Sequence, residues 1–169
     1  MPKILVDGLI YRQQRYGGIS RYFNESLSRI GLQCEDVEVI LHLPRVCKAE
    51  TPKAKWIREV IEWGLPSKII FEDLNRKLSL MRLRMLRPQI FHSTYYTQPF
   101  WPGMQTVVTV HDFIDERLPA LRGNPASLSI QKKCVIESAD RIIAVSNFVK
   151  NDILQYTAAK ESKIAVIYH

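Results

Sequence analysis

Short runs of apolar residues recur along this 169-residue chain, and each is followed by a stretch with helical periodicity. The runs are almost entirely apolar, whereas a strand with one solvated face would alternate apolar and polar residues. Strands of this kind are buried on both faces, so we expect a parallel sheet covered by helices on each side. The expected strands span residues 3–7, 37–43, 89–93, 106–112, 141–146 and 162–169.

Segments with helical periodicity fill the intervals between these runs. We expect helices over residues 19–30 (ended by Gly31), 55–63, 67–86 (ended just before Pro88), 126–138 and 147–156, with loops over 44–52 and 119–125. Ser146 stands immediately before the last helix, where its hydroxyl can accept a hydrogen bond from a backbone N–H of the first turn. The alternation predicts an α/β fold, a Rossmann-like three-layer sandwich with a mostly parallel sheet.

The composition is typical of one globular domain spanning residues 1–169. Hydrophobic residues make up 46% and charged residues 24%, and no apolar run approaches the roughly 18 residues of a membrane span. Asp7 and Gly8 interrupt the N-terminal apolar run too early for a signal peptide. Cys34, Cys47 and Cys134 are odd in number and include no CxxC pair, which argues against a disulfide framework and a zinc site. We therefore expect a cytoplasmic, reducing location.

The formal net charge of +7 favours anionic partners, namely nucleic acid, phospholipid or a phosphorylated small molecule. Basic residues are densest in "NRKLSLMRLRMLRP", residues 75–88. No aromatic residues are interleaved there to stack on bases, so we expect no nucleic-acid partner.

In parallel sheets ligands bind at the carboxyl ends of the strands, so the residues that follow each apolar run are the candidates for a site. Gly17 and Gly18 follow the first run, at the expected start of a helix. Neither the dinucleotide fingerprint GxGxxG nor a P-loop GK[ST] occurs. The glycine pair can form a plain strand-to-helix turn, or it can let a phosphate approach the helix N-terminus. Both interpretations stay open at this point.

His111 and Asp112 follow the apolar run "TVVTV". They suit either a hydrogen-bonded histidine beside a capping aspartate, or a histidine that orients a sugar hydroxyl or phosphate. A metal-dependent "HD" phosphohydrolase is excluded, because it needs an all-helical setting and further ligands, and the chain has only four histidines. No Gly-x-Ser-x-Gly elbow supports serine hydrolysis. Ser146 and Lys150 could grip a phosphate or an acceptor, or they are a helix cap and a solvated charge.

The order of these pieces resembles the N-terminal domain of glycosyltransferase family 4. The first strand is followed by "YGGISRY", "IFHSTYY", "VVTVHDFI", "ADRIIAVSNFVKNDIL" and "SKIAVIYH". The resemblance runs from Lys3 to His169; "VVTVHD" and the "ADRIIAVS" segment are its most specific parts, and residues 44–87 add little. Members of this family (group 1) are retaining, nucleotide-sugar-dependent glycosyltransferases of hexosyltransferase type, with two Rossmann-like domains that form the GT-B fold.

The resemblance implies roles for residues of this chain. Gly17 and Gly18 would approach the diphosphate of the donor, and His111 would be the catalytic residue that positions the transferred sugar. The acceptor side of the cleft would include Ser20, Arg21, Asp112, Asp115, Ser146 and Lys150. The resemblance implies no metal and no cofactor bound by this chain, with a nucleotide sugar as the co-substrate and a glycan, a lipid or a small molecule as the acceptor.

The resemblance also implies a C-terminal nucleotide-sugar-binding domain, with a pair of glutamates separated by seven residues, that is absent from this chain. We expect a fragment that is inactive alone, because catalysis needs donor and acceptor held together in a closed cleft. A free-standing Rossmann-like module that binds a phosphate-containing ligand is the alternative, and an unrelated hydrolase or dehydrogenase is a third hypothesis.

The basic helix expected over residues 67–86 has two interpretations. It can cover the sheet and leave a solvated basic face. It can also dock on an anionic membrane, as members of the resembled family that glycosylate lipids do, and the protein would then lie peripherally at the inner membrane surface.

Overall fold

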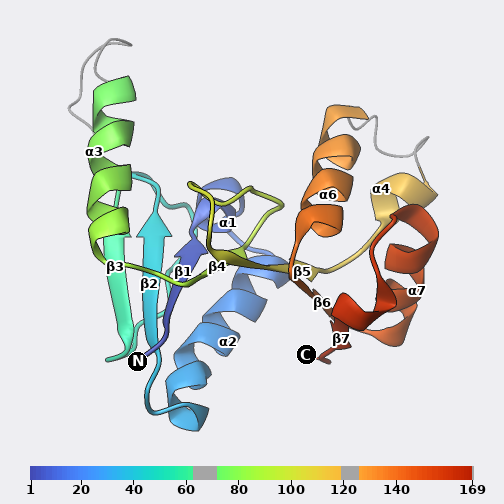
Figure 1. Ribbon diagram of the computed structural model, residues 1–169, viewed down its shortest axis with the longest axis horizontal. Helices are drawn as coiled ribbons and strands as arrows, with labels where there is room; N and C mark the ends of the chain where they lie inside the picture. The colour runs from blue at the N-terminus through green and yellow to red at the C-terminus, as the bar shows by residue number, and fades with distance from the viewer. Residues whose placement is uncertain (63–71, 119–125, 169) are drawn as a thin grey trace.

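The structure is a computed structural model that describes residues 1–62, 72–118 and 126–168. Seven strands form one sheet in the order β3-β2-β1-β4-β5-β6-β7, and every neighbouring pair is parallel. This confirms the α/β Rossmann-like architecture (Figure 1). The strands are β1 (Lys3–Asp7), β2 (Glu38–Leu43), β3 (Ile57–Ile61), β4 (Ile90–Ser93), β5 (Gln105–Val110), β6 (Arg141–Ala144) and β7 (Ile164–Val166).

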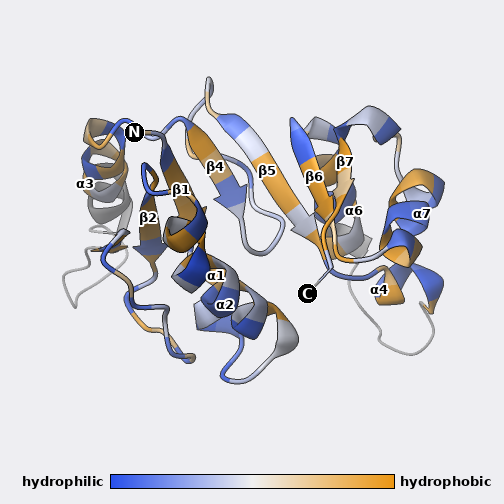
Figure 2. Ribbon diagram, turned by 90° about the horizontal axis from the view of Figure 1, so that it is seen from below, coloured by the Kyte–Doolittle hydropathy of each residue, from blue (hydrophilic) through white to orange (hydrophobic). Residues whose placement is uncertain are grey.

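Helices lie on both faces of the sheet. The helices α1 (Leu9–Gln13) and α2 (Gly18–Gln33) pack on one face, and α3 (Glu72–Met85), α6 (Ala126–Ser138) and α7 (Asn147–Tyr156) pack on the other (Figures 1 and 2). The short helix α4 (Ile114–Arg117) follows β5, and a single 3-10 turn, η2 (Glu161–Lys163), precedes β7. Neither α1 nor α4 was predicted from the sequence, and each is only about one turn long.

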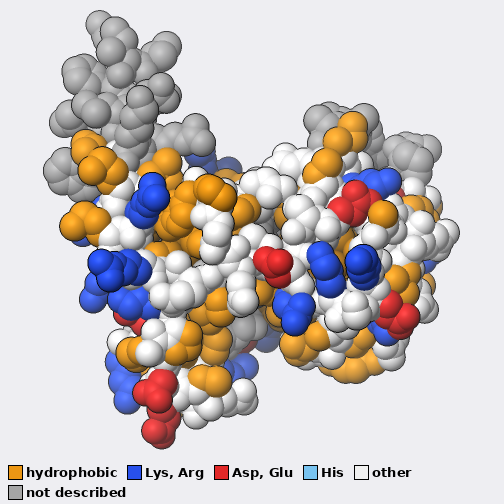
Figure 3. Space-filling model, in the orientation of Figure 1, with side chains coloured by type: hydrophobic (Ala, Val, Ile, Leu, Met, Phe, Trp, Pro, Cys, Tyr) orange, Lys and Arg blue, Asp and Glu red, His pale blue; other side chains and the backbone are white. Residues whose placement is uncertain are grey.

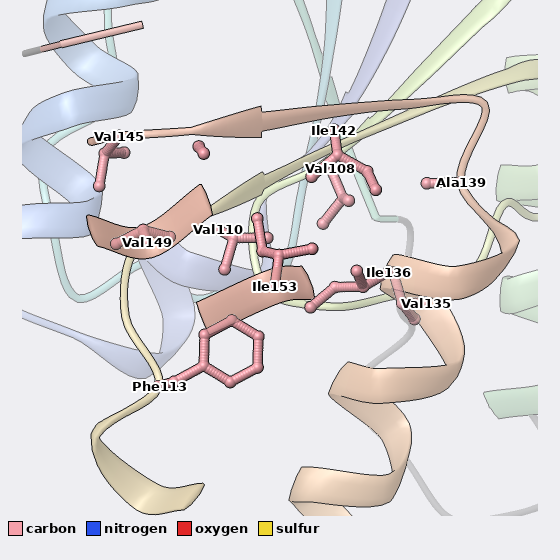
Figure 4. Close-up of a cluster of buried hydrophobic side chains, with 11 residues drawn as sticks. Val108, Val110, Phe113, Val135, Ile136, Ala139, Ile142, Val145, Val149 and Ile153 are labelled. Carbon is pink, nitrogen blue, oxygen red and sulfur yellow. The ribbon is translucent and has the colours of Figure 1, made fainter. Parts of the chain in front are cut away.

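Burial on both faces explains why the strands are almost wholly apolar. Val6 of β1 packs with Phe23 and Leu27 of α2, whereas its neighbour Leu5 packs with Leu83 of α3. The side chains alternate between the two faces, and both faces are covered. A third cluster joins β5 and β6 to α6 and α7, which both pack on one side of these two strands (Figure 4).

Two helices expected from periodicity are confirmed with the expected bounds, α6 and α7. The expected helix over residues 55–63 is wrong, because residues 57–61 form the edge strand β3, which pairs with β2. The mixture of apolar and charged residues there fits an edge strand as well as a helix. Residues 63–71, residues 119–125 and His169 lie outside the described residues, and with them the start of the helix expected over 67–86 and the expected loop 119–125.

Gly31 does not end α2, which continues to Gln33. The glycine has a packing role instead, because a Cβ at this position would lie 2.2 Å from the ring of Trp56. The indole Nε1–H of Trp56 also donates to the backbone oxygen of Leu27, at 2.9 Å. Trp56 therefore docks the segment before β3 on α2, and it needs a residue without a side chain to do so.

The strand order reverses direction beside β1. The chain passes from β1 outward through β2 to β3, and then returns to place β4 on the other side of β1. The loops after β1 and after β4 therefore diverge at the carboxyl edge of the sheet. In open α/β sheets this divergence creates the crevice in which ligands bind.

Candidate functional site

A pocket of about 350 Å³ opens at this edge, where segments that follow β1, β4 and β5 meet α6. The first segment contributes the start of α2, the second a pair of tyrosines and the third the residues from His111 to α4. The lining residues are Gln14, Gly18, Ile19, Tyr95, Tyr96, His111, Asp112, Asp115, Glu116, Leu128, Ser129 and Lys132. The structure thus brings together Gly18, His111, Asp112 and Asp115 of the predicted site residues.

Asp7 fixes the two diverging loops to each other. Its buried carboxylate accepts hydrogen bonds from the N–H of Leu9 (3.2 Å), from the N–H and hydroxyl of Thr94 (3.2 and 2.5 Å), and from the hydroxyl of Thr97. A carboxylate can satisfy four donors at once, and it thereby joins the end of β1 to the loop that carries Tyr95 and Tyr96. The role of Asp7 is to shape the rim of the pocket.

The glycine pair lies at the start of α2. Gly17 is the N-cap, in extended conformation, and a Cβ there would meet only the flexible end of Gln14. A Cβ on Gly18 would find no atom within 4 Å, so packing does not explain the glycine at this position. Ser20 is buried, and its hydroxyl donates to the backbone oxygen of Gly17 at 3.0 Å, while the side chain of Arg21 is exposed. Neither Ser20 nor Arg21 lines the pocket.

His111 lies against the aromatic side chains of α2. The ring of Tyr22 meets it edge to face, with centroids 5.1 Å apart, and Phe23 contacts both His111 and His92 in the same manner. His92 bonds to the hydroxyl of Thr109 through Nε2, at 2.9 Å. Burial, and to a smaller extent the neighbouring His111, lower the pKa of His92 to about 4. At neutral pH the imidazole of His92, next to His111, is therefore uncharged.

The opposite wall of the pocket is acidic and contains one buried lysine. The Nζ of Lys132, which is 5% exposed, donates to the carboxylate of Glu116 (3.0 Å) and to the backbone oxygen of Asp112 (2.6 Å). It also lies 4.0 Å from the ring centroid of Phe113. Lys132 thus ties α6 to the segment that carries His111 and Asp112. The carboxylate of Asp112 accepts from the N–H of Ile114 at 3.2 Å.

Tyr96 adopts a left-handed backbone conformation, with φ of 53°, that non-glycine residues rarely take. Its backbone oxygen accepts a hydrogen bond from Gln131 of α6, at 2.9 Å. Burial raises the pKa of its phenol, and the charge of Asp112 raises it further. The strained residue is therefore held in place at the pocket from both α6 and the loop after β5.

Ser146 and Lys150 do not line the pocket. The hydroxyl of Ser146 accepts from the N–H of Val149 at 3.1 Å, which confirms the predicted helix cap. Lys150 pairs with Glu161 at 2.7 Å, and the hydrogen bond lowers the pKa of that carboxyl. Both residues hold α7 and the segment before β7 in place.

Lys132, Glu116 and Gln14 line the pocket and were not predicted as site residues. Lys132 had a recognisable pattern, since it falls three and four residues before Val135 and Ile136, on the apolar face of α6. A lysine on such a face needs a buried partner, which is Glu116. Glu116 and Gln14 stand in short segments without periodicity, and no pattern in the sequence singles them out.

Within the described ranges, no three His, Cys, Asp or Glu side chains gather into a group that could hold a metal ion. None of the helices in those ranges is both long enough and apolar enough to cross a bilayer.

The chain resembles solved glycosyltransferase structures over its whole length. Sucrose-phosphate synthase from Thermosynechococcus elongatus superposes with a TM-score of 0.68 at 14% identity, covering 99% of this chain and 48% of that one. HepE from Anabaena, solved in complex with UDP and glucose, gives 0.61 at 12% identity (100% and 44%). The lipopolysaccharide outer core galactosyltransferase WaaB, in its apo form, gives 0.56 at 16% (100% and 46%).

These likenesses establish the fold, which is one half of a GT-B structure, and this chain spans less than half the length of each of those proteins. No curated protein sequence matches the chain. The profile of Glycosyltransferase Family 4 matches residues 16–169, which contain the glycine pair, His111 and the pocket wall. The match confirms the resemblance found in the sequence, and the chain therefore belongs to Glycosyltransferase Family 4.

Proposed function

We propose that this chain is the acceptor-side half of a retaining glycosyltransferase that moves a sugar from a nucleotide-sugar donor to an acceptor. The observation that carries the proposal is the pocket at the point where the strand order reverses. Gly18, His111 and Asp112 line this pocket, and the chain is a member of Glycosyltransferase Family 4. The similar fold of HepE, which was solved with UDP and glucose bound, supports a nucleotide-sugar donor. The donor-binding half would be a second, C-terminal domain.

Gly17 and Gly18 would face the diphosphate of the donor. The start of α2 offers backbone N–H groups without helical partners and the positive end of a 16-residue helix, with no acidic residue in its first turn. Since neither packing nor a left-handed backbone explains the glycine at position 18, close approach of a ligand is the explanation that we propose.

His111 would hold the transferred sugar through hydrogen bonds from its imidazole. The contact with Tyr22 restricts the orientation of the ring, and His92 places no positive charge beside it at neutral pH. We assign the acceptor side of the cleft to Asp112 and Asp115. The chain provides one wall of the cleft, so we expect no transfer without a donor-binding domain to exclude water and hold the nucleotide. We propose that this chain binds neither a metal ion nor a cofactor.

The test measures transfer of labelled sugar from UDP-, GDP- and ADP-sugars to oligosaccharide and lipid acceptors. We expect none from the 169-residue chain, and transfer when a donor-binding domain completes the polypeptide. In that protein, His111→Ala would lower turnover by about 10²-fold or more, the effect typical of losing one positioned catalytic group. Turnover by the 169-residue chain alone would overturn the half-site proposal, and full activity of His111→Ala would overturn the role of His111.

We further propose a peripheral location on a cytoplasmic, anionic membrane surface. Leu78, Met81 and Met85 recur at helical spacing on α3 and are all exposed, and the exposed Arg82 and Arg84 flank them. Figure 3 shows Lys and Arg side chains beside apolar ones in the part of the molecule that contains α3. An apolar stripe beside basic residues favours adsorption to anionic lipid. The chain has three cysteines and no CxxC pair, which suits a reducing compartment.

Vesicle flotation tests this location. We expect co-flotation with vesicles that contain phosphatidylglycerol, lost at high salt and lost in Met81→Ser/Met85→Ser. Equal recovery from neutral phosphatidylcholine vesicles would refute it.

A further inference from the structure

Gln14 presents an amide group at the pocket that the rest of the protein does not use. The residue follows α1 and lines the pocket together with Gly18. Its backbone N–H donates to the carbonyl oxygen of Ile10 at 3.0 Å, which ends α1. Among the described residues the side-chain amide has no hydrogen-bond partner, and of its two polar atoms only Oε1 is buried. The side chain therefore holds no loop through hydrogen bonds, and the two N–H groups on Nε2 can donate to a ligand.

Gly17 accounts for the position of this amide. The φ of Gly17 is −178°, an extended conformation that any residue adopts, so the backbone does not require glycine here. A Cβ on Gly17 would instead stand 2.0 Å from Oε1 and 2.8 Å from Cδ of Gln14, but 3.5 Å from its Nε2. The missing side chain makes room for the amide, whose oxygen lies against Gly17 and whose nitrogen lies further out. Beside it, a Cβ on Gly18 would find no atom within 4 Å, so this part of the pocket is open.

The local charge on this side of the pocket is positive. The acidic residues of the described lining all follow β5, and none comes from the segment after β1. Residues 12–21 contain no Asp or Glu and three exposed arginines, Arg12, Arg15 and Arg21. The start of α2 adds backbone N–H groups without helical partners. These groups favour an anion next to the amide of Gln14.

We propose that Gln14 is a phosphate-binding residue, whose Nε2 donates to an oxygen of the diphosphate held at Gly18. The inference rests on the proposed function, and it adds a side chain to a contact assigned above to the backbone alone. A hydrogen bond to a charged oxygen is stronger than one between neutral groups. Gln14 thus contributes to the affinity for the diphosphate without placing a further charge in the pocket.

The test is an NMR titration of the ¹⁵N-labelled chain with inorganic pyrophosphate, UDP and uridine. The side-chain NH₂ group of Gln14 gives its own pair of signals, which Gln14→Leu identifies by their loss. We expect this pair to shift with pyrophosphate and with UDP, together with the backbone amides of Gly18 and Ile19, and to stay in place with uridine. The NH₂ signals of Gln13, an exposed residue at the end of α1, should not shift with any of the three.

Matched variants measure the contribution of the amide. Gln14→Leu removes the donor at similar volume and should weaken UDP binding by about fivefold or more. Gln14→Glu replaces the donor by a charged acceptor, so the loss should reach at least about tenfold. Gln13→Leu and Gln13→Glu make the same changes one residue earlier and should change the affinity by less than about twofold. If a variant of Gln14 does not fold, the NH₂ signals of Gln14 in the original chain decide the question alone.

The outcomes separate the inference from the proposed function. Shifts of Gly18 and Ile19 with UDP while the NH₂ signals of Gln14 stay in place would overturn the inference and leave a diphosphate site at Gly18. Equal UDP affinity of Gln14→Leu and the original chain would do the same, as would equal losses in the variants of Gln13. Shifts of the Gln14 signals with uridine as large as those with UDP would also overturn it. Absence of any shift at Gly18 with both pyrophosphate and UDP would overturn the inference and the proposed function together.

Discussion

Replacing Asp7 by asparagine tests how the pocket is built. Asp7 is 4% exposed, and its two carboxylate oxygens accept from four donors, two at each oxygen. Asparagine has nearly the same shape but offers one oxygen and one NH₂ group. Whichever way the amide turns, two of the four donors face an NH₂ group. One of these two is a hydroxyl that can rotate, and the other is a backbone N–H that cannot.

The cost follows from these contacts. A hydrogen bond to a charged group contributes about 1.5–3 kcal/mol, and a buried donor left without an acceptor costs about 1–3 kcal/mol. With one backbone N–H of Leu9 or Thr94 stranded and the charge of the acceptor removed, we expect the free energy of unfolding to fall by about 3 kcal/mol. For a urea m-value of about 3 kcal/mol/M this corresponds to a midpoint lower by about 1 M.

The assay is urea denaturation followed by tryptophan fluorescence and by far-UV circular dichroism. Asp140→Asn is the matched control. Asp140 also accepts from a backbone N–H and a hydroxyl, those of Thr106 at 2.8 and 2.9 Å, but it is exposed. We expect a loss of less than about 1 kcal/mol there, because water replaces the lost acceptor. Equal midpoints for the two variants would refute the role assigned to Asp7.

Three further changes have defined outcomes. Gly31→Ala should lower the free energy of unfolding by about 1–3 kcal/mol and alter tryptophan fluorescence, because its Cβ would lie 2.2 Å from Trp56; a stabilised variant would show that helix propensity prevails. The pKa of His92, about 4, lies below its ordinary value of 6.5, so the unfolded chain binds a proton first as the pH falls. Stability should therefore fall by up to about 3 kcal/mol between pH 6.5 and pH 4, and His92→Gln should show a flatter profile in urea melts. Ser146→Ala should lower the free energy of unfolding by about 1 kcal/mol, because it removes the acceptor for the N–H of Val149. Thermal melts measure this loss, and Ser138→Ala, at an exposed serine of α6, is the control variant.

The sheet was predictable because burial on both faces leaves a direct trace in the sequence. A strand such as β1, with Leu5 facing α3 and Val6 facing α2, must be apolar at consecutive positions. The same logic locates His111 and Asp112, because a ligand edge is fixed once the strand ends are known. The edge strand β3 was predicted wrongly because only Val60 in it is fully buried, so its pattern does not distinguish a strand from a helix.

The pocket was predictable only on one side. Gly18, His111, Asp112 and Asp115 follow strands, and the structure places all four in the lining. The opposing wall depends on how α6 packs after a long connection, which no local pattern records. Ser146 also follows a strand, but its hydroxyl caps α7. Because this hydroxyl accepts from the N–H of Val149, it is not directed toward the pocket.

The most direct test of the account is the footprint of a nucleotide sugar on the ¹⁵N-labelled chain. A second cavity, of about 500 Å³ and lined by Pro44, Cys47 and Glu59, lies beyond the ends of β2 and β3 and provides an internal comparison. With UDP-glucose, the account predicts shifts at Gly18 and His111, none around Cys47, and a dissociation constant weaker than roughly 1 mM. Micromolar binding by the chain alone, or shifts confined to the second cavity, would contradict it.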